Sequence, residues 1–196
     1  MVPGRVVAGQ YEVVRVLGEG AMGAVVLARD QALDRAVALK FLKPAVSELM
    51  DGDRRFQQEA RLLSRLSHPN VVTVYAFGDD AQGLRYIAME YIDGHTLEAH
   101  IEPDFLLPLN VAGQVIRQVG FALTEAHARG VVHRDIKPGN ILLTSVAGTN
   151  HYVKVVDFGL AKLSEAGPDL AEGRGMDTTR DRGLALGTPA YISPEQ

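Results

Sequence analysis

The residues best suited to chemistry lie in one stretch from His133 to Asn140, with the sequence His-Arg-Asp-Ile-Lys-Pro-Gly-Asn. The spacing from Asp135 to Asn140 lets one loop offer a carboxylate to an incoming hydroxyl and an amide oxygen to a metal ion. Lys137 lies between them and can neutralise a phosphoryl group during its transfer. A generic loop that happens to hold the same polar residue types is the alternative interpretation.

A second stretch, Asp157-Phe158-Gly159, directly follows the apolar run 153–156. Magnesium prefers carboxylate oxygen and keeps several of its waters. An aspartate at the end of an apolar strand is therefore a candidate magnesium ligand. The alternative is an ordinary turn that contains an aspartate.

A third stretch carries glycines at Gly18, Gly20 and Gly23, followed by Val25, in the pattern G-x-G-x-x-G-x-V. Glycines let the backbone approach an anion closely and adopt positive φ. A tight hairpin turn without a ligand is one alternative. A dinucleotide-binding turn is another, but its glycines open a helix, whereas here the apolar run 25–28 follows. The order strand, glycines, strand favours a flap over phosphates.

Lys40 ends the otherwise apolar run 37–40, where a lysine on an edge strand facing solvent is the simplest interpretation. The pattern of 53–66 predicts a helix, and at about 100° per residue Glu59 falls inside its apolar arc, between Leu63 and Leu66. A carboxylate facing a core needs a cation. We therefore expect Lys40 and Glu59 to pair, with the ammonium also aimed at a phosphate.

The elements that must position these residues are predicted from hydrophobic periodicity, which changes along the chain. Strands are expected at 11–17, 25–28, 35–41, 71–77 and 84–89, with shorter ones at 141–143 and 153–156. Beyond 53–66, a second helix over 111–126 carries the apolar residues Val111, Val115, Ile116, Val119, Leu123 and Ala126. A boundary is expected at 93–94, and 165–187 is predicted to be a loop.

Composition excludes several classes of protein. The chain has 196 residues, 46% of them apolar, with a net charge of −4 and no cysteine. This balance is typical of a globular protein, and it gives no reason to expect nucleic acid or an anionic membrane as partner. The lack of cysteine rules out disulfides and thiolate metal sites. No signal peptide or membrane span is expected, so the segment is predicted to be soluble and cytoplasmic, with any membrane anchor lying elsewhere.

Taken in their order along the chain, the motifs resemble those of the eukaryotic-type serine/threonine protein kinase family, and in style most of all its bacterial members. The resemblance runs from about Tyr11 to the last residue. It implies an α+β, two-lobed kinase-like fold. Residues 1–92 would form a small antiparallel β lobe with one helix, and 93–196 an incomplete helical lobe. The sequence stops after Ser-Pro-Glu, where the family continues with further helices, so a truncated kinase is expected.

The resemblance also assigns residues to ATP and Mg²⁺. Asp135 would be the catalytic base, assisted by Lys137, Lys40 and Glu59, and Asn140 and Asp157 would hold the metal. Residues matching the family's regulatory spine are Leu63, Val74, His133 and Phe158. Residues matching the nucleotide site are Leu17, Gly18, Glu19, Gly20, Ala21, Met22, Gly23, Ala24, Val25, Ala38, Lys40, Met89, Glu90, Ile92 and Leu142.

Lys137 and Thr188 resemble the serine/threonine branch of the family, so the expected partner is a protein with a Ser or Thr acceptor. Arg134 matches the arginine that pairs with a phosphothreonine. Thr178 and Thr179 are the expected sites of autophosphorylation, in trans through self-association; a polar loop without a switch is the alternative. Two functions stay open: an active kinase, and a fragment that binds Mg-ATP without catalysis.

Overall fold

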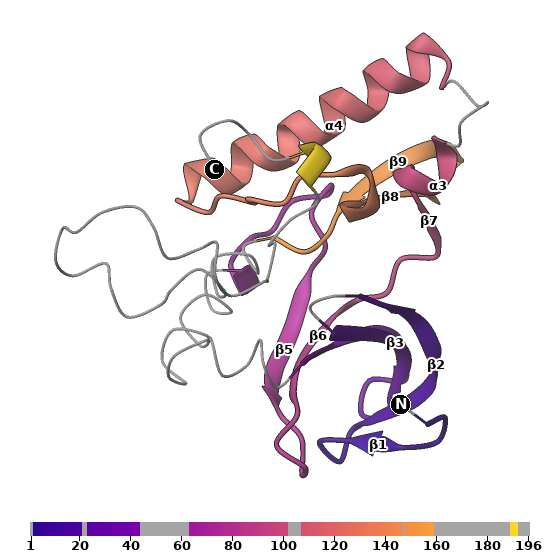
Figure 1. Ribbon diagram of the computed structural model, residues 1–196, viewed down its shortest axis with the longest axis vertical. Helices are drawn as coiled ribbons and strands as arrows, with labels where there is room; N and C mark the ends of the chain where they lie inside the picture. Colours follow the sequence, from indigo (N-terminus) through magenta and orange to yellow (C-terminus); the bar gives the residue numbers. More distant parts are fainter. Residues whose placement is uncertain are drawn as a thin grey trace, which may run out of the picture.

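The computed structural model describes residues 2–20, 23–43, 63–101, 107–146, 148–158 and 189–191. Within these residues the chain forms two antiparallel sheets and one long helix (Figure 1). The first sheet has the strand order β1-β2-β3-β4-β6-β5. Its strands are β1 (Val6–Val7), β2 (Tyr11–Glu19), β3 (Gly23–Asp30), β4 (Arg35–Leu42), β5 (Val74–Asp79) and β6 (Arg85–Glu90).

Strands β2 and β3 are joined at the glycine-rich stretch, as the sequence predicts. Gly18 lies opposite Val25, and the N–H of Gly20 donates to the carbonyl of Gly23 at 2.8 Å. Gly23 has a φ of 156°, and a Cβ there would overlap the carbonyl of Phe41 on β4. Glycine is therefore required at this position, and the stretch is a hairpin between strands, not the start of a helix.

The second sheet has the order β7-β8-β9, from β7 (Gly94–Thr96), β8 (Ile141–Val146) and β9 (Thr149–Val155). The short helix α3 (Leu97–His100) follows β7, and the 3₁₀ turn η1 (Pro138–Asn140) precedes β8. A further 3₁₀ turn, η2 (Pro189–Tyr191), lies near the end of the chain. The sequence analysis did not predict β1, β7, α3, η1 or η2, all of which are four residues or shorter.

Helix α4 (Leu109–Ala128) packs against β9 and confirms the predicted helix over 111–126. Val111, Val115, Ala122 and Ala126 are buried in one core cluster. Ile116 was expected on the same face, and this was wrong because the residue is 71% exposed. A rotation of about 100° from Val115 turns its side chain away from the buried stripe.

The segment before β5 joins the two sheets. The N–H of Val72 donates to the carbonyl of Val155, and the N–H of Val155 donates to the carbonyl of Asn70. Val71 therefore forms a parallel bridge with Val155. This pairing corrects the strand expected at 71–77: β5 begins only at Val74 because the preceding residues bond to β9.

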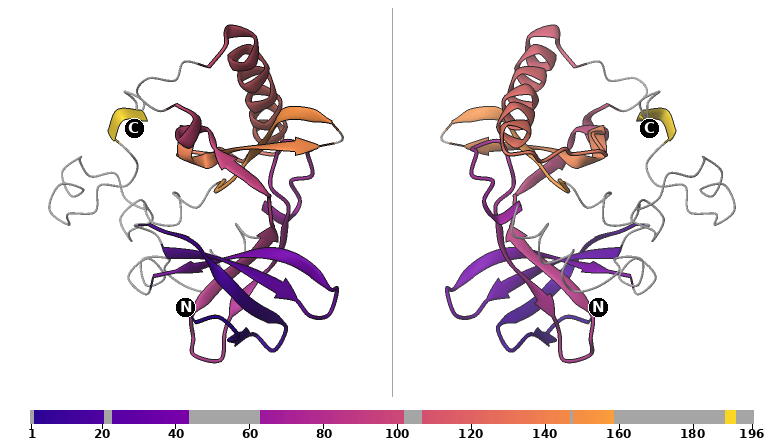
Figure 2. Two further views of the ribbon diagram at one scale, coloured as in Figure 1. Left: turned by 90° about the vertical axis from the view of Figure 1, so that its right-hand side faces the viewer. Right: turned by 90° about the vertical axis from the view of Figure 1, so that its left-hand side faces the viewer.

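In Figure 2 the six-stranded sheet lies at one end of the molecule, and α4 with the three-stranded sheet lies at the other. This arrangement is the expected two-lobed architecture. Most of the predicted helix over 53–66, with Glu59, and the whole predicted loop 165–187 lie outside the described residues. Among the helices that the structure describes, none is both long and apolar enough to cross a membrane.

Candidate functional site

The candidate site lies where β4, the loop before β8 and the residues after β9 meet. Lys40, on β4, forms an ion pair with Asp157, with 2.7 Å between Nζ and Oδ2. The lysine side chain is only 6% exposed and that of Asp157 is 27% exposed. Two residues predicted from separate motifs are thus brought together. The predicted partner Glu59 lies outside the described residues, so that pairing stays a prediction.

Asp157 adopts a backbone conformation that few aspartates take. Its φ is +63°, in the left-handed region that costs energy for residues other than glycine. Directly before it, β9 ends at Val155, and the N–H of Val156 donates to the carbonyl of Asn140. The strand end and the η1 turn are therefore held together, and the unusual backbone turns the Asp157 carboxylate toward Lys40.

The loop before β8 gathers the other predicted residues around Asp135. The side-chain amide of Asn140 donates to the backbone carbonyl of Asp135 at 2.7 Å and to its Oδ2 at 2.9 Å. Lys137 lies on the same carboxylate, 3.0 Å from Oδ2. The five-residue spacing read from the sequence therefore brings a carboxylate, a cation and an amide into direct contact. The Asn140 Nδ2 faces Asp135, so its Oδ1 points elsewhere and can bind a metal.

His133 positions this loop from inside the core, where it is 1% exposed. The N–H of Asp135 donates to Nδ1 at 3.2 Å, so the ring proton is on Nε2, which donates to the carbonyl of Val156 at 2.9 Å. Its ring also contacts Phe158, with centroids 4.5 Å apart. Burial lowers the pKa of His133 below its ordinary value of 6.5, which keeps the imidazole neutral and able to make both hydrogen bonds.

The four residues matched to a spine also come together. Leu63, Val74 and Phe158 line a small apolar cavity of about 20 Å³ beside Met89, and the ring of His133 contacts that of Phe158. A space of this size is about one water molecule. The cluster is therefore tightly packed between the two sheets.

Most residues matched to the nucleotide site lie on strands β2, β3, β4 and β6 of the first sheet, and Leu142 lies on β8 of the second. Ala38 on β4 faces Met89 on β6 in register, and both are buried in a cluster that Val25 packs against. Leu17, at the end of β2, is 38% exposed. Leu142 and Ile92 are partly buried. Ala21 and Met22 lie outside the described residues, as do Gly159, Thr178, Thr179 and Thr188.

Glu90 has contacts that the sequence analysis missed. Its Oε2 lies 2.8 Å from Nζ of Lys154 on β9 and accepts a hydrogen bond from the N–H of Thr73. Lys154 also donates to the carbonyl of Val71 at 3.4 Å. The only sequence signal for this ion pair was a single lysine within the apolar run 153–156.

Arg134 was predicted to be regulatory, and the structure places it in the loop before β8, beside Asp135, with a φ of +65°.

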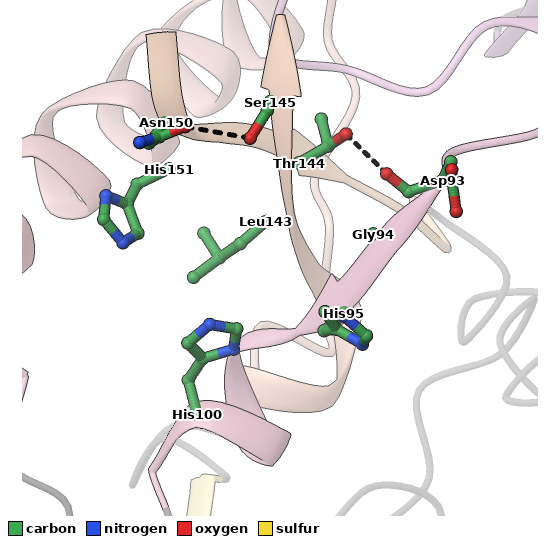
Figure 3. Close-up of a pocket in the computed structure, with 9 residues that line it drawn as sticks. All are labelled: Asp93, Gly94, His95, His100, Leu143, Thr144, Ser145, Asn150 and His151. Carbon is green, nitrogen blue, oxygen red and sulfur yellow. Dashed lines mark hydrogen bonds between the residues drawn. The ribbon is translucent and has the colours of Figure 1, made fainter. Parts of the chain in front are cut away.

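A larger hollow of about 530 Å³ lies away from these residues. Figure 3 shows His100 and His151 on either side of Leu143, and Thr144 donating to the carbonyl of Asp93. No residue predicted for catalysis, nucleotide or metal lines it. Within the part of the chain that the structure describes, no three His, Cys, Asp or Glu side chains are grouped to hold a metal ion.

Comparison with known proteins identifies the family. The protein kinase domain model matches residues 11–196. The serine/threonine-protein kinase pkn3 of Myxococcus xanthus is 42% identical over 98% of this chain, which covers 34% of that relative. PrkC of Bacillus subtilis is 37% identical over the whole chain, which covers 28% of it. The chain therefore belongs to the protein kinase family and resembles its bacterial serine/threonine members.

Solved structures agree on the fold. The kinase domain of Mycobacterium tuberculosis PknI matches with a TM-score of 0.70 and 36% identity, covering 82% of this chain and 63% of that one. The chain spans about a third of the length of the first two curated relatives. The chain therefore has the two-lobed protein kinase fold.

The buried imidazole predicts a pH-dependent stability. Because folding lowers the pKa of His133, the unfolded chain binds a proton at a pH where the folded chain does not. The free energy of unfolding should therefore fall as the pH drops below about 6.5, by at most about 1.4 kcal/mol per pH unit from this group. Urea unfolding from about pH 7.5 to about pH 5.5 measures this slope.

The variant His133→Phe should be less stable at neutral pH, because two hydrogen bonds are lost, but its slope below pH 6.5 should be flatter. His95→Gln, at an exposed site, is the control and should keep the slope of the parent chain. An unchanged slope in His133→Phe would contradict the assignment of this titration to His133.

Proposed function

We propose that this chain transfers the γ-phosphoryl group of Mg-ATP to a Ser or Thr hydroxyl of a protein. The observation that carries the proposal is the cluster around Asp135, whose carboxylate is bound by Asn140 and Lys137 on one short loop. The second support is the ion pair of Lys40 with Asp157. These residues supply the base, the cations and the oxygen ligands that phosphoryl transfer requires.

The residues present fit Mg-ATP. The Asp157 carboxylate and the Oδ1 of Asn140 would hold Mg²⁺, which needs few protein ligands because it keeps waters and binds phosphate oxygens. Lys40, paired with Glu59, and the backbone of 18–25 would bind the phosphates. The apolar side chains Leu17, Val25, Ala38, Met89 and Leu142, with the backbone of Glu90 and Ile92, would enclose the base. When bound, Mg-ATP supplies the phosphoryl group.

The chain's own residues would orient the acceptor hydroxyl and neutralise charge on the transferred phosphoryl group. Asp135 would accept a hydrogen bond from the acceptor hydroxyl and take its proton late in the transfer. Its carboxylate is kept in position by the amide of Asn140, and its backbone N–H by His133. Lys137, already beside Asp135, would offset the negative charge that builds up on the transferred group.

The remaining parts of the proposal rest on the sequence. Catalysis would take place in the cytoplasm, where ATP is available and a chain without cysteine gives no sign of disulfide chemistry. The partner would be a protein with a Ser or Thr acceptor, not nucleic acid, since the chain is mildly acidic.

Transfer of labelled γ-phosphate from Mg-ATP to a generic Ser/Thr protein acceptor tests the proposal. Asp135→Asn should lower the rate by at least about a hundredfold while nucleotide binding stays within about twofold, because the base is lost and the phosphate contacts are not. Asp93→Asn, an exposed aspartate away from the loop, is the matched control and should keep its activity. Nucleotide binding without any transfer by the parent chain would favour the alternative of a non-catalytic Mg-ATP-binding module.

The metal assignment predicts a magnesium-dependent defect. Asp157→Asn should raise the Kd for ATP in the presence of Mg²⁺ by about tenfold or more, because a charged metal ligand is lost. With the metal removed by chelator, the parent chain and the variant should bind ATP within about twofold of each other. Equilibrium titration with a fluorescent ATP analogue measures both values. An equal defect with and without magnesium would show that Asp157 acts through Lys40 and not through a metal.

We also propose autophosphorylation at Thr178 and Thr179, with the new phosphate paired to Arg134. In the assay above, the double variant Thr178→Ala, Thr179→Ala should lose most of the label on the chain itself. Transfer in trans requires two copies to meet, so labelling per chain should rise with protein concentration. Unchanged labelling and unchanged activity in the double variant would contradict this part of the proposal.

A further inference from the structure

Three of the chain's six histidines line the hollow of about 530 Å³ described above. They come from three elements: His95 from β7, His100 from α3 and His151 from β9. Among the described residues around the hollow, Asp93 is acidic and none is Lys or Arg. Imidazole nitrogen is a ligand for zinc, copper and nickel ions, and a carboxylate beside it favours a cation over an anion. The lining therefore suits a divalent transition metal ion.

Two of these imidazoles face each other. Figure 3 shows the rings of His100 and His151 turned toward one another, with the side chain of Leu143 beside them. The centroid of the His95 ring is 6.1 Å from that of His100. In the described part of the chain no three His, Cys, Asp or Glu side chains are grouped around one point. A metal site here therefore has two histidine ligands, and waters fill the other positions.

The ring proton of His100 is on the nitrogen that leaves the other one available to a metal. Its Nδ1 lies 3.4 Å from the carbonyl oxygen of Thr96. A carbonyl accepts hydrogen bonds and does not donate them, so the proton is on Nδ1 and Nε2 keeps its lone pair. Histidines that bind metals usually donate the other ring N–H to a carbonyl or a carboxylate in this way. Thr96 itself pairs with Leu142 on β8, so the ring is anchored to the second sheet.

His151 is held by a different element, helix α4. Its carbonyl accepts a hydrogen bond of 3.0 Å from the side-chain amide of Gln118. Its φ is +59°, in the left-handed region that costs energy for residues other than glycine. The bond to α4 fixes this unusual backbone, and from it the imidazole faces the hollow (Figure 3).

We propose that the hollow is a metal site, in which the Nε2 of His100 and a ring nitrogen of His151 together bind one Zn²⁺ ion or a similar transition metal ion. Mg²⁺ does not match these ligands, because it prefers oxygen in an octahedral arrangement. A bound ion would join α3 to β9 across β8 and would stabilise the folded chain. The site is separate from the residues proposed for Mg-ATP, and the inference does not rest on phosphoryl transfer.

Weak binding of metal by separate surface histidines is the competing explanation. The two explanations differ in how the losses combine. When two ligands share one ion, removing either one abolishes the tight binding, and removing both costs little more. Separate histidines lose one weak site each, so their losses add.

Calorimetric titration of Zn²⁺ into the full chain tests the proposal, without an affinity tag and at about pH 7.5, where imidazole is mostly neutral. We expect one ion per chain. His100→Gln should raise the Kd by at least about tenfold. His151→Asn should do the same, and asparagine is chosen because it tolerates the left-handed backbone. His127→Gln, at an exposed position on α4 outside the hollow, is the matched control and should keep the Kd within about twofold.

The double variant His100→Gln, His151→Asn should bind within about twofold of either single variant. Ni²⁺ should compete with Zn²⁺ and Mg²⁺ should not. Thermal unfolding in the presence of a chelator shows that each variant folds, and added Zn²⁺ should raise the midpoint of the parent chain but not of the variants.

Four outcomes would overturn the inference. They are the absence of saturable one-to-one Zn²⁺ binding by the parent chain, an unchanged Kd in either single variant, losses that add in the double variant, and a larger loss in His95→Gln than in His151→Asn. None of these measurements involves phosphoryl transfer, so failure of the proposed function is a separate result.

Discussion

The site depends on one buried, uncharged imidazole. His133 accepts a hydrogen bond from the backbone of Asp135 and donates one to the backbone just before Asp157. Both bonds need a neutral ring with its proton on Nε2, and burial in the core favours that form. Through this one side chain, the loop that carries Asp135 and the strand end that carries Asp157 share a common support.

Strand β9, which leads into the residues that His133 binds, is held in place by helix α4 and by Asn70. Helix α4 packs small and apolar residues against β9, and Ala122 and Ala126 are fully buried. Gln118, on the same helix, donates to the carbonyl of His151 and accepts from the N–H of Val153, so the free edge of β9 is bonded by a side chain. Asn70 completes the network by donating to Gln118 and to the carbonyl of Val153.

The sequence predicted the longer strands and helix α4, and the grouping of Asp135, Lys137 and Asn140, because local patterns carry this information. The hairpin at Gly18–Val25 and the cluster of Asp135 with Asn140 depend on residues close in the chain. Contacts between distant segments were not predictable in the same way. The pairing of Val71 with Val155 and the ion pair of Glu90 with Lys154 require knowledge of which strands meet. The exposure of Ile116 was missed because the spacing of apolar residues in a helix does not show how wide the buried face is.

The seam between the two sheets has a mechanical consequence. The N–H of Val155 donates to the carbonyl of Asn70, the N–H of Val72 donates to the carbonyl of Val155, and Lys154 on β9 pairs with Glu90 on β6. Rigid contacts of this kind, concentrated at β6, β9 and the segment before β5, would act as a pivot if one sheet turned against the other. Displacement in a rotation grows with distance from the axis, and β3 and β4 lie between β2, which carries Gly18, and β6, which carries Glu90. A few degrees of turning about this seam would therefore move Gly18 farther than Met89, which is the neighbour of Glu90 on β6.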